Sequence, residues 1–286
     1  RTLMLTDLRW ARAARHAAAA GLARTPARAV VYSSTTAALL WPRPGAIRFD
    51  APSAGNRPGR HGLWQRPLER RRIREAALLL PWSEGALRET SPHAGSHDAL
   101  VLPVPVEPSG VPGGRDVAAF AYAANPAKKG LDRILETWRR VRRPSEELVV
   151  AGSSKEALRK LGYALPAEGV RVLPLLAYDD YRALLRRVRV FVCAARREDY
   201  GIAQLEALAD GCMLVTTASP GPYAALPIAR ELDGRLVSDD LATALRTALD
   251  DPLPDYAERA LGALAPFRRG EVDRIVAEEL LPRLRA

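Results

Sequence analysis

Residues 188–211 read VRVFVCAARREDYGIAQLEALADG. The first eight residues are apolar except for Arg189, which is typical of a strand buried on both faces of a parallel sheet. Gly201 then allows a tight turn into a stretch without Gly or Pro that predicts a helix. The first N–H groups of such a helix have no partner within it. This stretch therefore predicts a strand, a glycine turn and a helix start that can meet a ligand.

The same alternation of strand and helix runs through the second half of the chain. Apolar runs predict strands, and amphipathic stretches such as residues 129–141 predict helices between them. Strands that alternate with helices of about ten residues favour a parallel sheet covered on both faces, and hence an α/β fold. The strands are expected at residues 117–123, 147–152, 170–176, 188–195 and 213–219.

The first part of the chain is organised differently. It predicts a helix at residues 7–24 and another from residue 65, with strands at 28–34, 46–50 and 77–81 and an extended segment at 99–107. The stretch 108–116, PSGVPGGRD, is rich in Pro and Gly and predicts a linker. We therefore expect a Rossmann-like domain at 1–108, a linker at 109–116 and a second Rossmann-like domain at 117–268. A helix at 269–286 is expected to pack back on the first domain.

The net charge of +10 is unevenly distributed. Residues 1–110 hold 16 Arg and no Lys against 8 acidic residues, whereas the other 176 residues hold 27 basic and 25 acidic ones. A basic domain favours an anionic partner such as a membrane surface. The alternative is a coding bias, because Arg outnumbers Lys 39 to 4 in the whole chain. Nucleic acid is not expected as a partner, since no recognition motif is present.

The sequence also predicts where the protein is located. No apolar stretch is long enough to span a membrane, and no secretory signal is visible at the start of the sequence. We expect a cytoplasmic protein, peripheral at the inner face of the membrane if the arginine-rich run 60–74 binds anionic lipid. A solvated helix is the alternative interpretation of that run.

Candidate site residues follow the predicted strands, because ligands of α/β sheets bind at the carboxyl ends of the strands. Lys128 and Lys129 precede Gly130 and a helix start, which suits a phosphate. Glu198 and Glu206, eight residues apart, flank the turn at Gly201. Carboxylates accept hydrogen bonds from sugar and ribose hydroxyls, so the group predicts a nucleotide sugar. The alternative is that Glu206 is solvated and Glu198 pairs with Arg196 or Arg197.

Taken together, residues 117–230 resemble the carboxy-terminal domain of glycosyltransferase family 4, retaining transferases of the GT-B fold. The resemblance rests on motifs in the family's order and spacing. These are KKGLDRILETW at 128–138, ELVVAG at 147–152, VRVLPLL at 170–176, residues 181–217 with the two glutamates, and SPGPYAAL at 219–226. The resemblance implies two Rossmann-like domains and transfer of a hexosyl group from a nucleotide diphosphate sugar to a sugar, lipid or small-molecule acceptor.

The resemblance also implies roles for individual residues. Glu198 contacts the donor sugar and Lys129 neutralises the leaving diphosphate. The backbone N–H groups of Gly201 and Ile202 bind the diphosphate, and Glu206 binds the ribose. Lys128, Tyr200 and Gly152 complete the predicted nucleotide-sugar site. No cofactor and no metal ion is expected, since the nucleotide sugar is a substrate.

The chain departs from the family pattern at several places, and the family's glycine-rich loop after its first strand has no counterpart in the sequence. Ala124 stands where members commonly have an arginine that binds phosphate, so either Lys128 or an arginine elsewhere in the chain replaces it or diphosphate binding is weakened. Asp50 stands near the expected position of a cleft histidine and is a candidate for orienting donor or acceptor; a turn-capping aspartate is the alternative. The segment before the linker is short for a complete amino-terminal domain. These departures keep open a second hypothesis, a catalytically impaired GT-B-like scaffold or regulatory subunit.

Two further residue types carry little functional signal. His93 and His97 stand four apart, but Pro and Gly around them predict a loop rather than a metal-binding helix. Cys193 and Cys212 lie in apolar sequence without metal-ligand spacing and are expected to be buried thiols.

Overall fold

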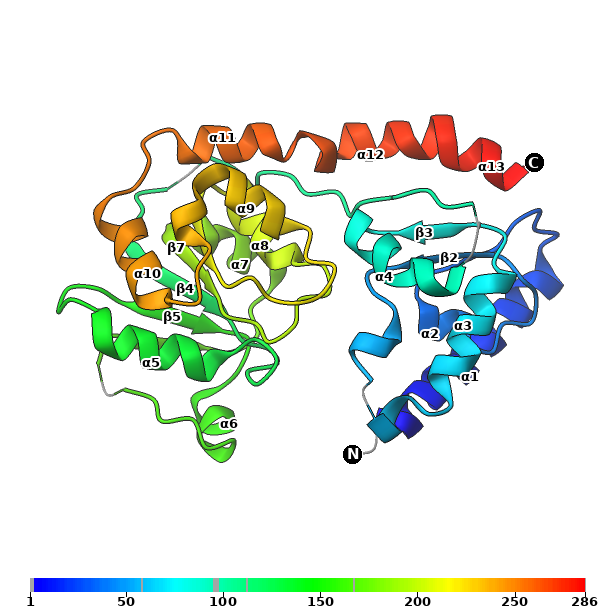
Figure 1. The fold of residues 1–286 in the computed structure, drawn as a ribbon, viewed down its shortest axis with the longest axis horizontal. Helices are drawn as coiled ribbons and strands as arrows, with labels where there is room; N and C mark the ends of the chain where they lie inside the picture. Colours follow the sequence, from blue (N-terminus) through cyan, green and yellow to red (C-terminus); the bar gives the residue numbers. More distant parts are fainter. Residues whose placement is uncertain (1–2, 58, 95–97, 112, 167, 286) are drawn as a thin grey trace. The chain divides into compact units, whose positions relative to one another are not determined.

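The structure is a computed structural model that describes residues 3–57, 59–94, 98–111, 113–166 and 168–285 (Figure 1). The contacts divide the chain into two compact units. One comprises Arg1–Val104 together with Gly270–Ala286, and the other comprises Pro105–Arg269. In the described part of the chain, no helix is both long and apolar enough to cross a membrane.

The second unit contains a five-stranded parallel sheet in the order β6-β5-β4-β7-β8. All five strands lie where the sequence predicts them, which confirms the α/β fold with a parallel sheet. Their bounds are β4 (Val117–Tyr122), β5 (Leu148–Ala151), β6 (Val170–Leu173), β7 (Val188–Cys193) and β8 (Met213–Thr216).

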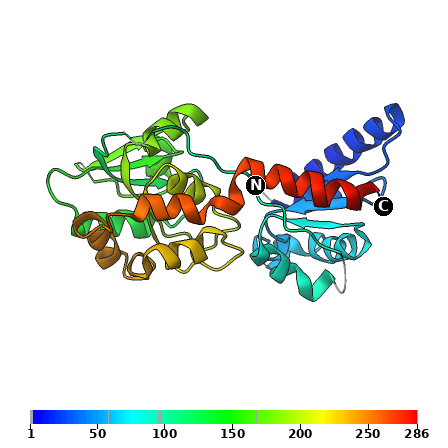
Figure 2. The ribbon, with the colours of Figure 1, turned by 90° about the horizontal axis from the view of Figure 1, so that it is seen from above.

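Helices cover both faces of this sheet (Figures 1 and 2). Helices α5 and α10 pack together on one face, whereas α8, α9 and α11 pack together on the other. Trp138 and Leu131 of α5 are fully buried, because the apolar residues of this helix repeat at the spacing of one helical face. The helices are α5 (Leu131–Val141), α6 (Lys155–Lys160), α7 (Tyr178–Leu185), α8 (Ile202–Ala209), α9 (Ala225–Asp233), α10 (Leu241–Asp250) and α11 (Tyr256–Ala263).

The first unit is built on a three-stranded parallel sheet in the order β1-β2-β3. Successive side chains of a strand point to opposite faces, so Ile47 and Leu79 pack with Trp41 and Ile73 on one face. The described elements are α1 (Leu3–Arg24), β1 (Val31–Tyr32), α2 (Thr35–Ala38), β2 (Ala46–Phe49), α3 (Gln65–Glu75), β3 (Leu79–Pro81) and α4 (Glu84–Ala94).

The other face of this sheet is covered by the end of the chain. Leu78 and Leu80 pack with Val272 and Leu280 in one apolar cluster. These last two residues come from α12 (Arg269–Ile275) and from a π-helical turn (Val276–Leu280), which α13 (Leu281–Arg285) follows. The apolar residues of the carboxy-terminal helix thereby complete the core of the first unit.

The structure differs from the sequence-based expectations in two segments. A loop is predicted around His93, where the last part of α4 forms; Ser83 accepts a hydrogen bond from the N–H of Ala86 at the start of this helix, and Pro92 falls only in its last turn. The predicted linker 109–116 lies within the second unit, because Ser109 donates from its backbone N–H to Asp210 (2.7 Å). The division between the units falls earlier, at Val104 and Pro105.

The loops that follow β4 and β7 contact each other, because the two strands are neighbours in the sheet. The N–H of Arg196 donates to the carbonyl oxygen of Lys128 (2.9 Å). Gly130 has a φ of +66°, and a Cβ atom there would lie 2.0 Å from the carbonyl oxygen of Ala194. Only glycine tolerates both the backbone conformation and this close approach.

Gly130→Ala is expected to lower the free energy of unfolding by more than about 1 kcal/mol, because alanine is strained at positive φ and clashes with Ala194. Urea denaturation measures the change. Gly262→Ala in α11 is the matched control: no heavy atom lies within 4 Å of its added Cβ, and it is expected to raise the free energy of unfolding by about 0.5–1 kcal/mol. A Gly130→Ala protein as stable as the wild type would contradict the argument.

Candidate donor site

The two loops at the carboxyl ends of β4 and β7 bring Lys129 to Glu198. The Nζ atom of Lys129 lies 2.7 Å from Oε2 of Glu198. The side chains are 21% and 6% exposed, respectively, so the pair is largely shielded from water. The alternative that Glu198 pairs with a neighbouring arginine is wrong: Arg196 pairs with Asp132, and Arg197 pairs with Asp199.

Two further contacts fix Glu198. Its backbone N–H donates to the carbonyl oxygen of Pro220 (3.0 Å), in the loop after β8. The Nε2 atom of Gln204, in the first turn of α8, donates to Oε2 of Glu198 (2.9 Å). Sequence reasoning did not single out Gln204. Its signal was a polar side chain among the apolar residues of α8, where Glu206 is the other polar residue, and Gln204 is only 1% exposed.

Glu206 lies in the same helix and is 7% exposed, so the alternative that it is a solvated surface residue is wrong. The hydroxyl of Tyr178 donates to Oε1 of Glu206 (2.9 Å), and Nη1 of Arg182 lies 3.9 Å from that oxygen. Burial raises the pKa of Glu206 above its ordinary value, although Tyr178 and Arg182 act in the opposite direction.

Arg182 is a buried cation that sequence reasoning missed. Its Nε donates to Oδ2 of Asp210 (2.8 Å), its Nη1 to the hydroxyl of Tyr178 (2.9 Å) and its Nη2 to the carbonyl oxygen of Glu107 (2.8 Å). Burial disfavours its charge, but the bond to Asp210 leaves the pKa of Arg182 above its ordinary value. Arg182 therefore stays charged and orients Tyr178, which in turn contacts Glu206.

A pocket of about 310 Å³ opens beside Glu206. It lies at the ends of β4 and β5, at Tyr122 and Ala151, and at the start of α8. One carboxylate in an otherwise apolar and aromatic lining suits a flat ring that carries a hydroxylated sugar. The other lining residues are Leu175, Leu176, Tyr178, Tyr181, Ile202 and Ala203.

The glycine turn before α8 adopts the geometry that the sequence predicts. Gly201 caps the helix with a φ of +86°, and a Cβ atom there would lie 2.7 Å from the ring of Tyr223. Ile202, the first residue of the helix, is 39% exposed and lines the pocket. The free N–H groups at this helix start lie between the two carboxylates in the sequence and provide a position for an anion.

Three other predicted site residues do not line the pocket beside Glu206. Lys128 forms an ion pair with Asp199. Tyr200 is 3% exposed and does not line the pocket beside Glu206. Gly152 lies in the turn after β5, packed against Ala124 and the ring of Tyr122.

Asp50 belongs to the first unit, at the carboxyl end of β2. Its Oδ1 accepts a hydrogen bond from the N–H of Ala51 (2.8 Å), which is the contact of a turn-capping residue. A role in orienting donor or acceptor stays a prediction.

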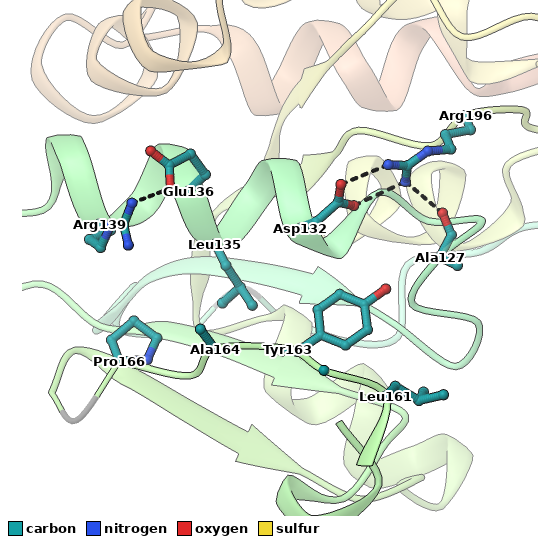
Figure 3. Close-up of a pocket in the computed structure, with 11 residues that line it drawn as sticks. Ala127, Asp132, Leu135, Glu136, Arg139, Leu161, Tyr163, Ala164, Pro166 and Arg196 are labelled. Carbon is teal, nitrogen blue, oxygen red and sulfur yellow. Dashed lines mark hydrogen bonds and ion pairs between the residues drawn. The ribbon is translucent and has the colours of Figure 1, made fainter. Parts of the chain in front are cut away.

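A second pocket of about 420 Å³ lies along α5 and has a wall formed by Arg196 (Figure 3). The guanidinium of Arg196 donates to Asp132 and to the carbonyl oxygen of Ala127, and the pocket also contains the ring of Tyr163. Its acidic and basic side chains are paired with each other, as Glu136 is with Arg139. The guanidinium group of Arg196 is therefore paired with α5.

No group of three or more His, Cys, Asp or Glu residues that could hold a metal ion occurs within the described ranges. Contrary to the predicted loop, His93 falls in the last residues of α4, and His97 lies outside the described residues. Cys193 and Cys212 are both buried free thiols, as expected. Burial raises the pKa of Cys212 to about 12, so this thiol stays protonated.

Comparisons with known proteins agree with the fold. Residues 115–251 match the model of the family described as "Glycosyl transferases group 1". This stretch is just under half of the chain and contains both glutamates and Lys129. No curated protein matches the sequence.

Several solved structures are similar to the chain over most of its length, and they establish the GT-B fold. WaaG, a glycosyltransferase involved in lipopolysaccharide biosynthesis, has a TM-score of 0.64 at 19% identity, over 88% of this chain and 79% of WaaG. HepE from Anabaena, in complex with UDP and glucose, has a TM-score of 0.63 at 15% identity, over 86% and 74%. Sucrose-phosphate synthase from Thermosynechococcus elongatus has a TM-score of 0.63 at 14% identity, over 89% and 72%.

Glu206→Gln is expected to increase the free energy of unfolding at pH 7.5. The raised pKa means that the folded state holds the proton of Glu206 more tightly than the unfolded state does, so the ionised carboxylate destabilises the unliganded fold. The gain should shrink as the pH falls through this raised pKa towards the ordinary value of 4.5, because Glu206 is then neutral as well. Urea denaturation at several pH values measures it, with the exposed Glu136→Gln as control. A difference that does not depend on pH would contradict the prediction.

Proposed function

We propose that this protein is a retaining glycosyltransferase that moves a hexosyl group from a nucleotide diphosphate sugar to an acceptor. The observation that carries the proposal is the group formed by Lys129, Glu198 and Glu206 around the start of α8. This group lies at the carboxyl ends of parallel strands, where α/β proteins bind ligands, and within the stretch that matches the transferase family model.

The proposed donor binds in an extended arrangement along this edge of the sheet. The base and ribose occupy the pocket beside Glu206, whose carboxylate accepts hydrogen bonds from the ribose hydroxyls. The diphosphate lies on the N–H groups of Gly201 and Ile202, at the positive end of the helix dipole. The sugar then reaches Glu198, which accepts from its hydroxyls.

Lys129 supplies the main catalytic interaction in this proposal. Negative charge develops on the diphosphate as the bond to the sugar breaks, and an ammonium group beside the departing phosphate stabilises that charge. The acceptor hydroxyl attacks from the side on which the diphosphate departs, so the configuration at the sugar carbon is retained. Asp50 is the candidate in the first unit for orienting donor or acceptor.

For the acceptor, we propose a lipid-linked or anionic molecule. The basic surplus of the first 110 residues supports this choice. Arg70 and Arg74 lie four apart on α3, are exposed, and have no hydrogen-bond or ion-pair partner among the described residues. Such a helix face can bind phosphate or carboxylate groups at a membrane surface, which would place the protein at the inner face of a cytoplasmic membrane.

A second candidate function, a catalytically impaired scaffold, is favoured by one specific observation. Ala124 lacks a cationic side chain, and both lysines before Gly130 are ion-paired, Lys128 with Asp199 and Lys129 with Glu198. A diphosphate would have to compete with a carboxylate for each of these cations. Binding of a nucleotide without donor hydrolysis or transfer would favour this scaffold.

Calorimetry with UDP and with GDP tests the donor site. We expect the wild type to bind one of them with a Kd below millimolar, and Glu206→Ala to bind it tenfold or more weakly. Hydrogen bonds to a charged group are worth about 1.5–3 kcal/mol, and 1.4 kcal/mol corresponds to a factor of ten. Glu136→Ala, at the separate pocket along α5, should bind like the wild type. If the wild type binds neither nucleotide at millimolar concentration, the donor site is refuted.

Lys129→Ala tests the catalytic part of the proposal. Loss of a group that stabilises the charge of the leaving diphosphate is expected to lower kcat for donor hydrolysis or transfer by about 10²–10³. Release of UDP or GDP from the corresponding nucleotide sugar measures the rate. Lys155→Ala, an exposed lysine at the start of α6, should keep the wild-type rate. A fully active Lys129→Ala protein would contradict the assigned role.

A further inference from the structure

Gln204 contacts the candidate site without being positioned to contact the donor. Gln204 is 1% exposed. Lys129, Cys193 and Tyr122 line a small cavity with it, whose volume of about 10 Å³ is enough for a single water molecule. Its Nε2 donates to Oε2 of Glu198 (2.9 Å) and to Sγ of Cys193 (3.0 Å). Gln204 therefore contacts the candidate site through its hydrogen bond to Glu198.

The orientation of the Gln204 amide follows from its neighbours. The opposite orientation would turn the amide oxygen towards a carboxylate oxygen, and two acceptors in contact repel each other. With the NH₂ group on Glu198, the Oε1 atom is left buried and has no hydrogen-bond partner in the part of the chain that the structure describes. A buried acceptor without a partner costs stability, and an apolar side chain of the same shape would avoid that cost. A glutamine at this position is consistent with a need for the N–H group that it offers to Glu198 as a hydrogen-bond donor.

Gln204 and Lys129 bind the same oxygen of Glu198. Nζ of Lys129 is 2.7 Å and Nε2 of Gln204 is 2.9 Å from Oε2, whereas Oε1 accepts no hydrogen bond from any described residue. In the proposed function, Lys129 must also interact with the leaving diphosphate. When its ammonium group turns to the phosphate, Gln204 is the side-chain donor that remains on Oε2 among the described residues.

We propose that Gln204 is a positioning residue that holds the Glu198 carboxylate in place while Lys129 interacts with the leaving diphosphate. This inference rests on the proposed donor site. Gln204 fixes Oε2, so that Oε1 is directed to the hydroxyls of the donor sugar throughout the reaction. Lys129 can thereby leave the carboxylate and contact the phosphate while Gln204 keeps Glu198 in position.

Gln204→Met tests the role, because methionine has a similar shape but no N–H donor. UDP lacks the sugar, so its Kd should stay within about twofold of the wild-type value, whereas kcat for hydrolysis of UDP-glucose should fall about tenfold. The Tm should change little, because the lost hydrogen bond to Glu198 offsets the removal of the Oε1 atom, which has no partner among the described residues. Leu205→Met, at the fully buried next residue of α8, controls for repacking and should hydrolyse UDP-glucose at the wild-type rate. GDP and GDP-mannose replace these probes if calorimetry selects GDP.

Gln204→Glu adds a measurement that a purely structural role would not affect. It places a second carboxylate against Glu198, and two close carboxylates disfavour ionisation of both. The kcat of this variant should be lower than that of the wild type at pH 8, and the ratio of variant to wild-type kcat should rise as the pH falls and one carboxyl group takes up a proton. A ratio that does not depend on pH would count against contact between residue 204 and Glu198 in the working enzyme.

The outcomes separate this inference from the proposed function. A wild type that binds UDP together with a Gln204→Met variant of wild-type kcat would refute the role of Gln204 and leave the donor site intact. A Gln204→Met variant that loses UDP binding, kcat and Tm together would show that Gln204 only packs. A wild type that binds neither nucleotide would refute the donor site itself, and the role of Gln204 with it.

Discussion

The ion pair between Lys129 and Glu198 is the interaction on which the candidate site depends. Its partners are 69 residues apart in the sequence and meet because β4 and β7 are parallel neighbours whose carboxyl ends share one edge of the sheet. The close approach of Gly130 to Ala194 brings the two loops together. Because Glu198 is only 5% exposed, removal of Lys129 would leave a buried carboxylate with less compensation. The pair thus supports both the local structure and the proposed chemistry.

Glu206 depends on a second set of contacts, centred on Arg182. This guanidinium connects Tyr178, which donates to Glu206, with the carbonyl oxygen of Glu107. The side chain of Glu107 in turn accepts from the N–H of Arg269 (2.7 Å), so the segments that begin and end the second unit are joined to each other. A single buried cation therefore connects the carboxylate proposed for ribose with both ends of its unit. The two glutamates of one motif are held by separate sets of partners.

Much of the secondary structure of the second unit can be predicted from local sequence patterns. The apolar run at 188–193 predicted a buried strand, Gly201 predicted the turn, and the spacing of Leu131, Ile134, Leu135 and Trp138 predicted one face of α5. The three strands of the first unit are only two to four residues long, and they lie within the predicted ranges. The second face of this sheet is covered by residues from the far end of the chain. Which sheet face those residues cover has no local sequence signal, because it depends on which apolar faces remain uncovered.

The sequence by itself determined the α/β class, the strands of the second unit and the residue types of the site, because periodicity, glycine turns and charged residues after strands are local properties of the chain. Only the tertiary structure decided which partner each charge has. It paired Lys129 with Glu198 and Lys128 with Asp199, turned Arg196 to Asp132, and brought Gln204 to the same oxygen as Lys129. The physical reason is that ion pairs and buried hydrogen bonds form between residues close in space, and strand order sets that closeness over distances that no sequence spacing reveals.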